Sequence, residues 1–537
     1  MTATLYNRSY RQTVALGREG DGEGPAAIRS IVIVGGGTAG WMTALILAQA
    51  LIRRGVEIAL LESPTVETIG VGEGSTPWLR GFFDGLGIEE SEWMPACNAT
   101  YKCGIGFDGW STRPGFERYF HPFASMLDNL SMTQFAHNVE ARMRGADVPA
   151  HPDRFFIASR LAQARLAPIA PDHFPFDVWY GYHFDAALLG AYLHRKAVER
   201  GVRYRSCHVT NVNLDERGNI ASVATREGET IGADFFVDCT GFASLLIGKA
   251  LGTPFVSFSE NLFNDAAVAM PTPMDASIPS QTLATAMKHG WAWKIPLTSR
   301  YGNGYVYSSN FCSADEAEAE LREALGARES DTPARHLKMR VGRATRHWNR
   351  NCLAVGLAQG FIEPLEATAL LFIQKTAMGI VSFLEQGDLG EAAHDRFNAA
   401  VNEHFEGTRD YIVTHYKTNS RTDTEYWRAN AANLNISEPL KRIYSLWMTG
   451  QSIIPELRSQ KSGQAYPIFS WLCIMAGMGI FPERGELKPP SAAEDRYRMA
   501  EVDNLLARSA LNFQDHRKVL GEIPPRRKDE SLQIYFW

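Results

Sequence analysis

The feature that most constrains the fold of this chain is a glycine-rich turn, Gly35-Gly36-Gly37-Thr38-Ala39-Gly40, set between apolar segments. Arg29–Val34 before it has the continuous apolar pattern of a buried strand, and Thr38–Arg53 has the pattern of a helix. Val56–Glu62 then predicts a second strand. Two such strands joined by a helix form a βαβ unit, so the sequence predicts an α/β fold that starts near residue 28.

The turn has glycine at the positions that a dinucleotide-binding loop requires. The first glycine permits the tight turn, the third lets a pyrophosphate approach the backbone, and the last lets the helix pack closely on the strand. Free N–H groups at the helix start favour phosphate, and an acidic residue ending the second strand can accept a hydrogen bond from a ribose hydroxyl. The predicted contacts in this unit are Gly35, Gly37, Thr38, Ala39, Gly40 and Glu62.

Two later segments indicate that the dinucleotide is FAD. Phe235–Cys239, followed by Thr240-Gly241, resembles the later strand and Thr-Gly pair of two-domain FAD proteins. Val355-Gly356-Leu357-Ala358 lies where those proteins usually carry Gly-Asp-Ala, although the aspartate is absent here. The sequence has no second GxGxxG preceded by a strand. We therefore expect the flavin to arrive already reduced, as FADH2, from a separate NAD(P)H-dependent flavin reductase.

Composition excludes several classes of partner. The net charge of −6 gives no electrostatic case for nucleic acid or an anionic membrane, and the longest apolar run, Trp471 to Phe481, is too short to span a bilayer. The first 29 residues lack the apolar core of a signal peptide. Seven cysteines are scattered without CxxC pairs, which favours reduced thiols and argues against a metal site. These features predict a cytoplasmic enzyme.

The chain divides into three predicted regions. Residues 1–27 form a flexible N-terminal segment, 28–390 an FAD-binding body interleaved with substrate-side elements, and 391–537 a mainly helical lobe that completes the substrate site. The middle of the chain mixes irregular aromatic segments with short strands, such as Tyr204–Val212. Helical periodicity runs through 365–386, 391–417, 436–449 and 493–510. The expected fold is a mixed α/β, two-domain, Rossmann-like flavoprotein.

Tryptophan is rare, yet two tryptophans lie two residues apart in Trp291-Ala292-Trp293-Lys294-Ile295-Pro296. In an extended strand, residues i and i+2 point to the same face, so the two indoles form one rigid apolar wall. Such a wall can belong to a packed core or can line a passage for a small molecule. The pattern alone leaves both alternatives open.

Five segments in order resemble the flavin-dependent halogenases of the tryptophan-halogenase type. They are Gly70–Pro77, Asn98–Lys102, the Trp-x-Trp-x-Ile-Pro segment, Glu363–Thr368 and Leu472–Gly479. The resemblance implies that FADH2, O2 and chloride or bromide yield hypohalous acid. This acid passes down a tunnel to a lysine, which presents the halogen to an electron-rich aromatic ring. The alternatives are a flavin-dependent aromatic hydroxylase, indifferent to halide, and a protein that binds flavin or aromatics without turnover.

Lys102 matches the lysine of that family, and Glu366 matches its paired acid. Burial would lower the pKa of Lys102 and make it a better nucleophile or a directed donor, whereas an isolated lysine in this pattern would lie on the surface of a strand. A carboxylate near the ring can orient the halogen donor or remove the ring proton. The competing interpretation of Glu366 is a first-turn residue of a helix that starts at Pro364.

Further residues are assigned by the resemblance. The backbone N–H groups of Thr368 and Ala369 are expected to bind halide, and Trp291 and Trp293 to line the tunnel. Four more cofactor contacts are expected at Gly72, Glu73, Val209 and Leu357. The predicted substrate contacts are His121, Phe123 and Tyr466, and a buried histidine bonded within the core is the competing interpretation of His121.

The sequence departs from the family where tryptophan-specific members hold the amino-acid head group. Aligned without gaps, it offers Ile454-Pro455, Lys461 and Ala465-Tyr466 in place of tyrosines, a glutamate and Phe-Trp. A lysine cannot receive an ammonium group, and Ile-Pro supplies no hydroxyl for a carboxylate. The expected substrate is therefore indole or another electron-rich aromatic without that head group.

Overall fold

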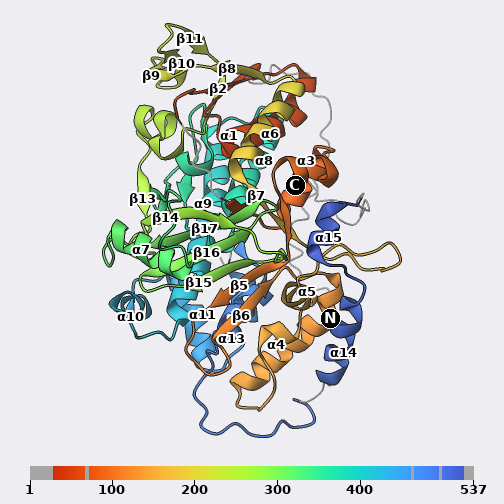
Figure 1. The fold of residues 1–537 in the computed structure, drawn as a ribbon. Helices are drawn as coiled ribbons and strands as arrows, with labels where there is room; N and C mark the ends of the chain where they lie inside the picture. Colours follow the sequence, from red (N-terminus) through yellow and green to blue (C-terminus); the bar gives the residue numbers. More distant parts are fainter. Residues whose placement is uncertain (1–27, 67–71, 461–464, 495–498, 525–537) are drawn as a thin grey trace.

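The computed structural model describes residues 28–66, 72–460, 465–494 and 499–524 (Figure 1). The predicted flexible segment 1–27 and the residue Lys461 lie outside them. A six-stranded sheet has the order β20-β21-β12-β1-β2-β8. At its centre β1 (Ser30–Val34) runs parallel to β2 (Glu57–Glu62) and β12 (Phe235–Asp238), and α1 (Thr38–Leu51) connects β1 to β2. The predicted βαβ unit is confirmed. The remaining strands of this sheet are β8 (Arg203–Ser206), β20 (Trp348–Asn349) and β21 (Cys352–Ala354).

A seven-stranded sheet forms the second layer, in the order β18-β14-β17-β16-β15-β5-β6. Its strands are β5 (Gly104–Asp108), β6 (Arg118–Pro122), β14 (Ala266–Pro273), β15 (Thr282–Ala286), β16 (Gly290–Pro296), β17 (Arg300–Tyr307) and β18 (Arg335–Lys338). One row of paired residues crosses five strands: Tyr119, Phe107, Ala284, Trp293 and Gly304. The neighbouring row contains His121, Ile105 and Thr282. The register therefore brings distant parts of the chain to one face.

Three small sheets complete the β-structure. In the first, β7 (Gly181–Asp185) pairs with β3 (Gly72–Gly74) and β4 (Thr100–Lys102). A second contains β9 (Val209–Leu214), β10 (Ile220–Thr225) and β11 (Thr230–Gly232), and a third contains β13 (Phe255–Ser257), β19 (Gly342–Ala344) and β22 (Gly360–Phe361). The prediction of one strand over Tyr204–Val212 is wrong. Cys207 donates the last bond from this strand to Glu62 at the end of β2, and the chain then enters a different sheet at Val209.

The C-terminal part is mainly helical, as predicted. Its helices are α8 (Ala369–Gln386), α9 (Glu391–Thr418), α10 (Glu425–Ala432), α11 (Glu438–Met448), α12 (Ile454–Ser459), α13 (Ile468–Gly477), α14 (Met499–Ala510) and α15 (His516–Gly521). The others are α2 (Trp78–Gly85), α3 (Glu90–Ala96), α4 (Asn129–Met143), α5 (Ile157–Ala164), α6 (Ala186–Glu199) and α7 (Ala314–Ala324). In Figure 1, α14 lies beside α4 and α5, so the C-terminal segment returns to pack on an early part of the chain.

The start of α8 differs from the prediction. Pro364 begins a single 3-10 turn, Pro364–Glu366, and Ala367 then adopts a left-handed conformation with φ of 56°. The α-helix starts only at Ala369, with Thr368 as its N-cap. Glu366 is therefore not a first-turn residue of α8. The helix-dipole interpretation of Glu366 is wrong for this reason.

Two large apolar cores fill the molecule, and both draw side chains from each side of residue 390. One core combines Ile105 and Trp291 with Ile412 and Leu506, and the other combines Ile33 and Leu47 with Phe397. The boundary predicted at 390 falls between α8 and α9, and whether it separates folding units stays a prediction.

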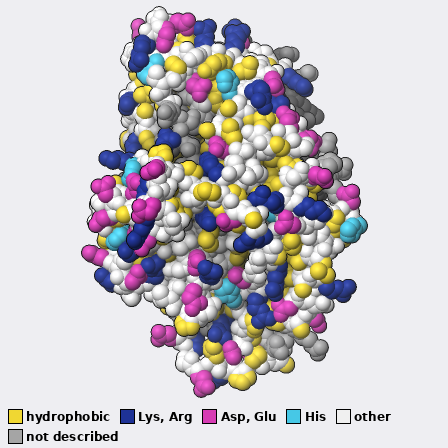
Figure 2. Space-filling view, in the orientation of Figure 1, with side chains coloured by type: hydrophobic (Ala, Val, Ile, Leu, Met, Phe, Trp, Pro, Cys, Tyr) yellow, Lys and Arg dark blue, Asp and Glu magenta, His cyan; other side chains and the backbone are white. Residues whose placement is uncertain are grey.

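No helix among the described residues is long and apolar enough to cross a membrane. On the face of the molecule shown in Figure 2, acidic and basic side chains are intermixed. This distribution offers no continuous basic surface on that face.

Gly304 is required by the packing of the tryptophan wall. A Cβ atom at Gly304 would lie 2.1 Å from Cζ2 of Trp293, so the indole lies flat on the glycine backbone. We expect Gly304→Ala to lower the free energy of unfolding by about 1–3 kcal/mol, because the ring must move within a filled core. Gly190→Ala is the control, since Gly190 lies within α6 with no heavy atom within 4 Å of the added Cβ. That change should be neutral or stabilising by about 0.5–1 kcal/mol. Thermal melts of both variants test this, and an unchanged Gly304→Ala protein would contradict it.

Candidate active site

The glycine turn has the geometry of a phosphate-binding loop. Gly35 has φ of +114°, and a Cβ there would lie 2.2 Å from the carbonyl oxygen of Cys239. A Cβ at Gly40 would lie 1.9 Å from the carbonyl oxygen of Gly35, so helix and strand pack too closely for a side chain. By contrast, nothing lies within 4 Å of the corresponding position at Gly37. The space beside Gly37, at the N-terminus of α1, fits a pyrophosphate.

Other predicted cofactor residues lie around this turn. The side chain of Glu62 lies against Gly36, within 2.2 Å of an added Cβ, and Val209 packs on the apolar cluster that contains Leu61. The 3-10 turn Gly356–Ala358 contains Leu357, and its first residue contacts Ala39. The structure thus brings together residues from four separate segments. Their role as FAD contacts stays a prediction.

Gly72 and Glu73 lie on β3, which runs from the tryptophan strand to Lys102. A Cβ at Gly72 would lie 3.5 Å from Ile295, and one at Gly74 would lie 3.2 Å from Nζ of Lys102. Burial and the nearby carboxylate of Asp185 raise the pKa of Glu73 to about 7. The short strand thus lies between the strand of the two tryptophans and the buried amine of Lys102.

Lys102 is completely buried on β4. Its ammonium has no hydrogen-bond partner among the described residues, and it lies 5.5 Å from the ring centre of Phe123. Burial lowers the pKa of Lys102 to about 7, and the negative charge of Glu366 opposes this shift. The alternative of a surface lysine is wrong. A buried amine without a partner that titrates near neutral pH is available to a ligand.

Glu366 is buried and bonded by two histidines. Nδ1 of His121 lies 2.9 Å from Oε2 and 3.1 Å from Oε1, and Nε2 of His415 lies 3.0 Å from Oε1. Burial alone would raise the pKa of Glu366, but the two histidines outweigh it and lower the pKa to about 2. The carboxylate is therefore fixed in orientation by groups from β6 and α9.

His121 is engaged on both ring nitrogens. Its Nε2 lies 2.9 Å from the hydroxyl of Ser470 and 3.4 Å from the hydroxyl of Tyr411. The competing interpretation, a histidine bonded within the core, thus describes its contacts. Tyr466 stacks on Tyr411 with ring centres 3.6 Å apart. Whether an aromatic substrate contacts His121, Phe123 and Tyr466 stays a prediction.

The two tryptophans lie on one face of β16, as predicted, with ring centres 6.2 Å apart. Trp291 donates its indole N–H to Oε2 of Glu363 at 2.9 Å, and Tyr416 donates to the same oxygen at 2.7 Å. Both indoles are buried, so the structure shows a packed wall. Its role as a tunnel lining stays a prediction.

The predicted halide donors lie at the start of α8. Thr368 is its N-cap and Ala369 its first residue, and the first N–H groups of a helix lack partners within the helix. Thr368 is buried whereas Ala369 is exposed. Halide binding at these groups stays a prediction.

Sequence reasoning missed His415, Tyr411, Ser470 and the bond of Glu363 to Trp291. One signal could have found the first of these. The helix α9 is buried over residues 410–416, yet it places Asp410, Thr414 and His415 among apolar neighbours. Buried polar residues need partners, so such a face indicates a polar network. Which partners they find depends on tertiary packing.

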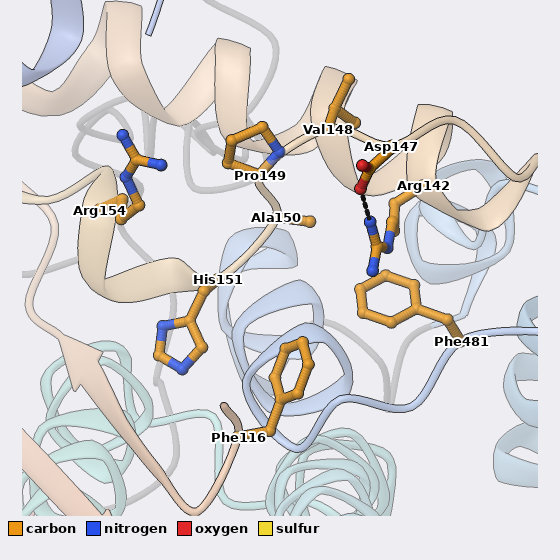
Figure 3. Close-up of a pocket in the computed structure, with 9 residues that line it drawn as sticks. All are labelled: Phe116, Arg142, Asp147, Val148, Pro149, Ala150, His151, Arg154 and Phe481. Atoms are coloured by element: carbon orange, nitrogen blue, oxygen red, sulfur yellow. Dashed lines mark hydrogen bonds and ion pairs between the residues drawn. The ribbon is translucent and has the colours of Figure 1, made fainter. Parts of the chain in front are cut away.

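A separate surface pocket of about 410 Å³ lies between α4 and the segment after α13 (Figure 3). Arg142 is ion-paired there with Asp147, and the rings of Phe116 and Phe481 lie at its rim. None of the predicted site residues lines it. Among the described residues, no group of three or more His, Cys, Asp or Glu side chains could hold a metal ion.

Comparison with known proteins decides the family. A model of the tryptophan halogenase family matches residues 30–492. The chain belongs to the tryptophan halogenase family. It is 38% identical over 501 residues to the tryptophan 6-halogenase SttH of Streptomyces toxytricini, which covers 87% of this chain and 93% of the relative. It is 36% identical over 483 residues to the tryptophan 7-halogenase RebH of Lentzea aerocolonigenes, covering 85% and 90% of the two chains.

Solved structures agree with the sequence matches. BrvH, a flavin-dependent halogenase from Brevundimonas sp. BAL3, superposes with a TM-score of 0.79 at 31% identity and covers 93% of this chain and 99% of its own. The predicted mixed α/β flavoprotein fold and the halogenase class are confirmed. The alternative of an aromatic hydroxylase loses its support. This halogenase is therefore flavin-dependent and acts on aromatics.

The buried amine should destabilise the free enzyme in a pH-dependent way. The pKa of Lys102 is lowered from 10.5 to about 7, so between these values the unfolded chain binds more protons than the folded one. The free energy of unfolding therefore rises with pH over this window, and below it the full penalty of the buried charge remains. We expect Lys102→Met to raise the free energy of unfolding most at pH 6, by roughly a few kcal/mol, and progressively less toward pH 10. The melting temperature should rise in the same order. A melt series across pH checks this, and a gain that grows with pH would contradict it.

Proposed function

We propose that this halogenase uses FADH2, O2 and chloride or bromide to halogenate an electron-rich aromatic such as indole, with Lys102 as the relay. The observation that carries the proposal is the state of Lys102, which is fully buried and has no hydrogen-bond partner among the described residues. Desolvating an amine without a partner is costly, so its retention calls for a function. The negative charge of Glu366 acts on the pKa of Lys102, which supports assigning both groups to one site.

Reduced flavin, with O2 and halide, supplies hypohalous acid when it is bound. The glycine turn would hold the pyrophosphate beside Gly37, and the Glu62 carboxylate would accept a hydrogen bond from a ribose hydroxyl. The N–H groups of Thr368 and Ala369 at the start of α8 would hold halide, because the positive end of the helix dipole favours anions. Gly72, Glu73, Val209 and Leu357 would complete the flavin contacts.

Lys102 and Glu366 would then act on the halogen and the ring. The amine, whose pKa burial lowers to about 7, can bond to the halogen donor and aim it at one carbon. Glu366 can take the proton that the ring loses, because two histidines keep its carboxylate ionised and oriented. Trp291 and Trp293 would separate the substrate from the flavin, and their packed wall would confine the acid to a path toward Lys102.

The proposed substrate lacks an amino-acid head group. Ile454 and Pro455 begin α12, and their apolar side chains carry no donor for a carboxylate. Lys461 lies outside the described residues. Ring contacts would come from Phe123, from Tyr466 and from the face of His121. Affinity would then come from ring burial at about 25 cal/mol per Å².

A separate NAD(P)H-dependent flavin reductase is the proposed partner. The one dinucleotide loop of this sequence is assigned to FAD, so hydride must reach the flavin elsewhere. All seven cysteines are free, which suits a reducing compartment, and we place the enzyme in the cytoplasm.

Removal of the amine should abolish halogenation but preserve the flavin site. With FAD, a flavin reductase, NADH, O2, bromide and indole, wild-type enzyme should give brominated indole, detected by mass. Lys102→Met should lose product by at least about 100-fold, the scale of one essential proton-transfer or orienting group, with unchanged FAD affinity. Lys294→Met is the matched control, because Lys294 lies on the opposite face of β16 from the tryptophans and should retain product. Product from Lys102→Met at wild-type rate would exclude Lys102 as the relay.

Indole should be a better substrate than free tryptophan. A zwitterionic head group without partners must lose its hydration, which reduces affinity. We expect kcat/KM for indole to exceed that for tryptophan, with reaction at C3, the most nucleophilic carbon of indole. Parallel kinetics with product analysis by NMR test this. Faster turnover of tryptophan, or attack at a single benzo-ring carbon, would show that a head-group site exists.

A further inference from the structure

His415 lies at the centre of the α9 face that meets Glu366, and it is fully buried. Its Nδ1 lies 3.1 Å from the backbone carbonyl oxygen of Tyr411, one helical turn earlier. Its Nε2 lies 3.0 Å from Oε1 of Glu366. Both ring nitrogens therefore face oxygen atoms, and each of these two contacts needs a proton between its atoms.

Hydrogen-bond chemistry fixes the number of protons on this pair. A carbonyl oxygen can only accept, so Nδ1 of His415 must carry a proton. A neutral imidazole has one N–H, and Nε2 would then be a bare lone pair facing Glu366. The 3.0 Å contact is attractive only if the imidazole is doubly protonated or if Glu366 itself is protonated. In either case one proton lies between Nε2 and Oε1.

His121 does not need an additional proton. Its Nδ1 can donate to Glu366, while its Nε2 faces the hydroxyls of Ser470 and Tyr411, each of which can donate. A neutral His121 therefore satisfies all of its contacts. The stored proton belongs to the contact between His415 and Glu366.

We propose that His415 is a positioning residue that holds one proton in its contact with Glu366, so that the pair acts as both acid and base in a single halogenation. This assignment rests on the proposed function, and it adds a residue and a proton inventory to it. The overall reaction is ArH + HOX → ArX + H2O. As the ring carbon forms its bond to X, the O–X bond breaks and its electron pair leaves with oxygen as hydroxide.

The stored proton balances that step. The His415–Glu366 pair gives its proton to the hydroxide, which becomes water. The cationic ring intermediate then loses its proton from the halogenated carbon to the Glu366 carboxylate, and the ring regains its aromatic electron pair. The pair ends with the one proton with which it began, so no exchange with bulk water is needed inside a buried site.

Several titratable groups face this pair from the surrounding elements. They are Lys102 on β4, Tyr119 and His121 on β6, Glu363 and Tyr466 on loops, Tyr411 on α9 and Cys473 on α13. Burial raises the pKa of Tyr119, Tyr411, Tyr466 and Cys473 well above their usual values, so these four stay protonated at neutral pH. Lys102, His121 and Glu363 are the other titratable groups that face the pair.

The first experiment measures the proton directly on the wild-type chain, without turnover. Nitrogen-15 NMR of histidine-labelled protein reports the protonation of both ring nitrogens of His415, assigned by comparison with His415→Gln. Infrared difference spectra between wild type and Glu366→Gln report whether Glu366 is a carboxylate or a carboxylic acid. A doubly protonated His415, or a protonated Glu366, supports the proposal. A neutral His415 beside an ionised Glu366 overturns it.

The second experiment measures the effect on catalysis. Gln can still donate to Glu366 but cannot hold an exchangeable charge, so His415→Gln should lower kcat about 100-fold with little change in KM. Its acid limb in the kcat–pH profile should move to higher pH, because Glu366 loses one of the two histidines that lower its pKa. His347→Gln is the control, since His347 is equally buried but bonded to Asn402 on another part of α9. Folding is checked by FAD affinity and thermal melts.

The outcomes separate the two proposals. If a folded His415→Gln protein keeps both the wild-type kcat and the wild-type pH profile, His415 has no role in the proton balance. If wild-type enzyme yields no halogenated product, the proposed function fails, while the NMR and infrared results still decide where the proton lies.

Discussion

The burial of Lys102 near Glu366 is the constraint on which the rest of the site depends. An ammonium removed from water without a bonded partner is unfavourable, and the negative charge of Glu366 offsets only part of that penalty. The fold must therefore hold Lys102 in place by other means. It does so by enclosing β4 between β7 and the seven-stranded sheet, where Gly74 leaves room for Nζ because it has no side chain. The burial of apolar side chains in the two large cores offsets the unfavourable free energy of the buried ammonium.

One short loop organises both sides of the site. Glu363 and Glu366 lie three residues apart around the turn Pro364–Glu366, and both are buried. Glu363 holds the indole of Trp291, while Glu366 holds His121 and His415. Left-handed Ala367 then redirects the chain so that Thr368 and Ala369 begin α8. Both carboxylates and the helix start lie within the seven residues from Glu363 to Ala369, and Glu363 also holds Trp291 of the wall. A shift of this loop would therefore disturb the carboxylates, the wall and the helix start together.

The sequence predicted those parts of the structure that local pattern or motif dictates. The βαβ unit follows from apolar periodicity and glycine spacing, and the shared face of Trp291 and Trp293 follows from the geometry of any strand. The predicted start of α8 was wrong because Pro364 is equally suited to a 3-10 turn. The local sequence also gives no indication that Ala367 adopts a left-handed conformation. His415 was not predicted as a site residue, because only the packing of α9 on the Glu363–Ala369 loop brings it to its partner, Glu366.

The relatives indicate how catalysis and orientation are divided in such a site. SttH is named for attack at position 6 of tryptophan and RebH for position 7, yet this chain is 38% and 36% identical to them. Overall similarity therefore does not encode the ring position, and the groups that activate the halogen must be separable from those that orient the ring. In this chain the proposed activating groups lie on β4 and the Glu363–Ala369 loop, whose contacts run to the sheets and α9. The proposed ring contacts include Tyr466, which stacks on Tyr411 of α9. Tyr466 lies outside the loop that carries Glu366, so a change of this residue would alter the proposed ring contact without removing Lys102 or Glu366. Substrate preference can then diverge while the proton and halogen chemistry stays fixed.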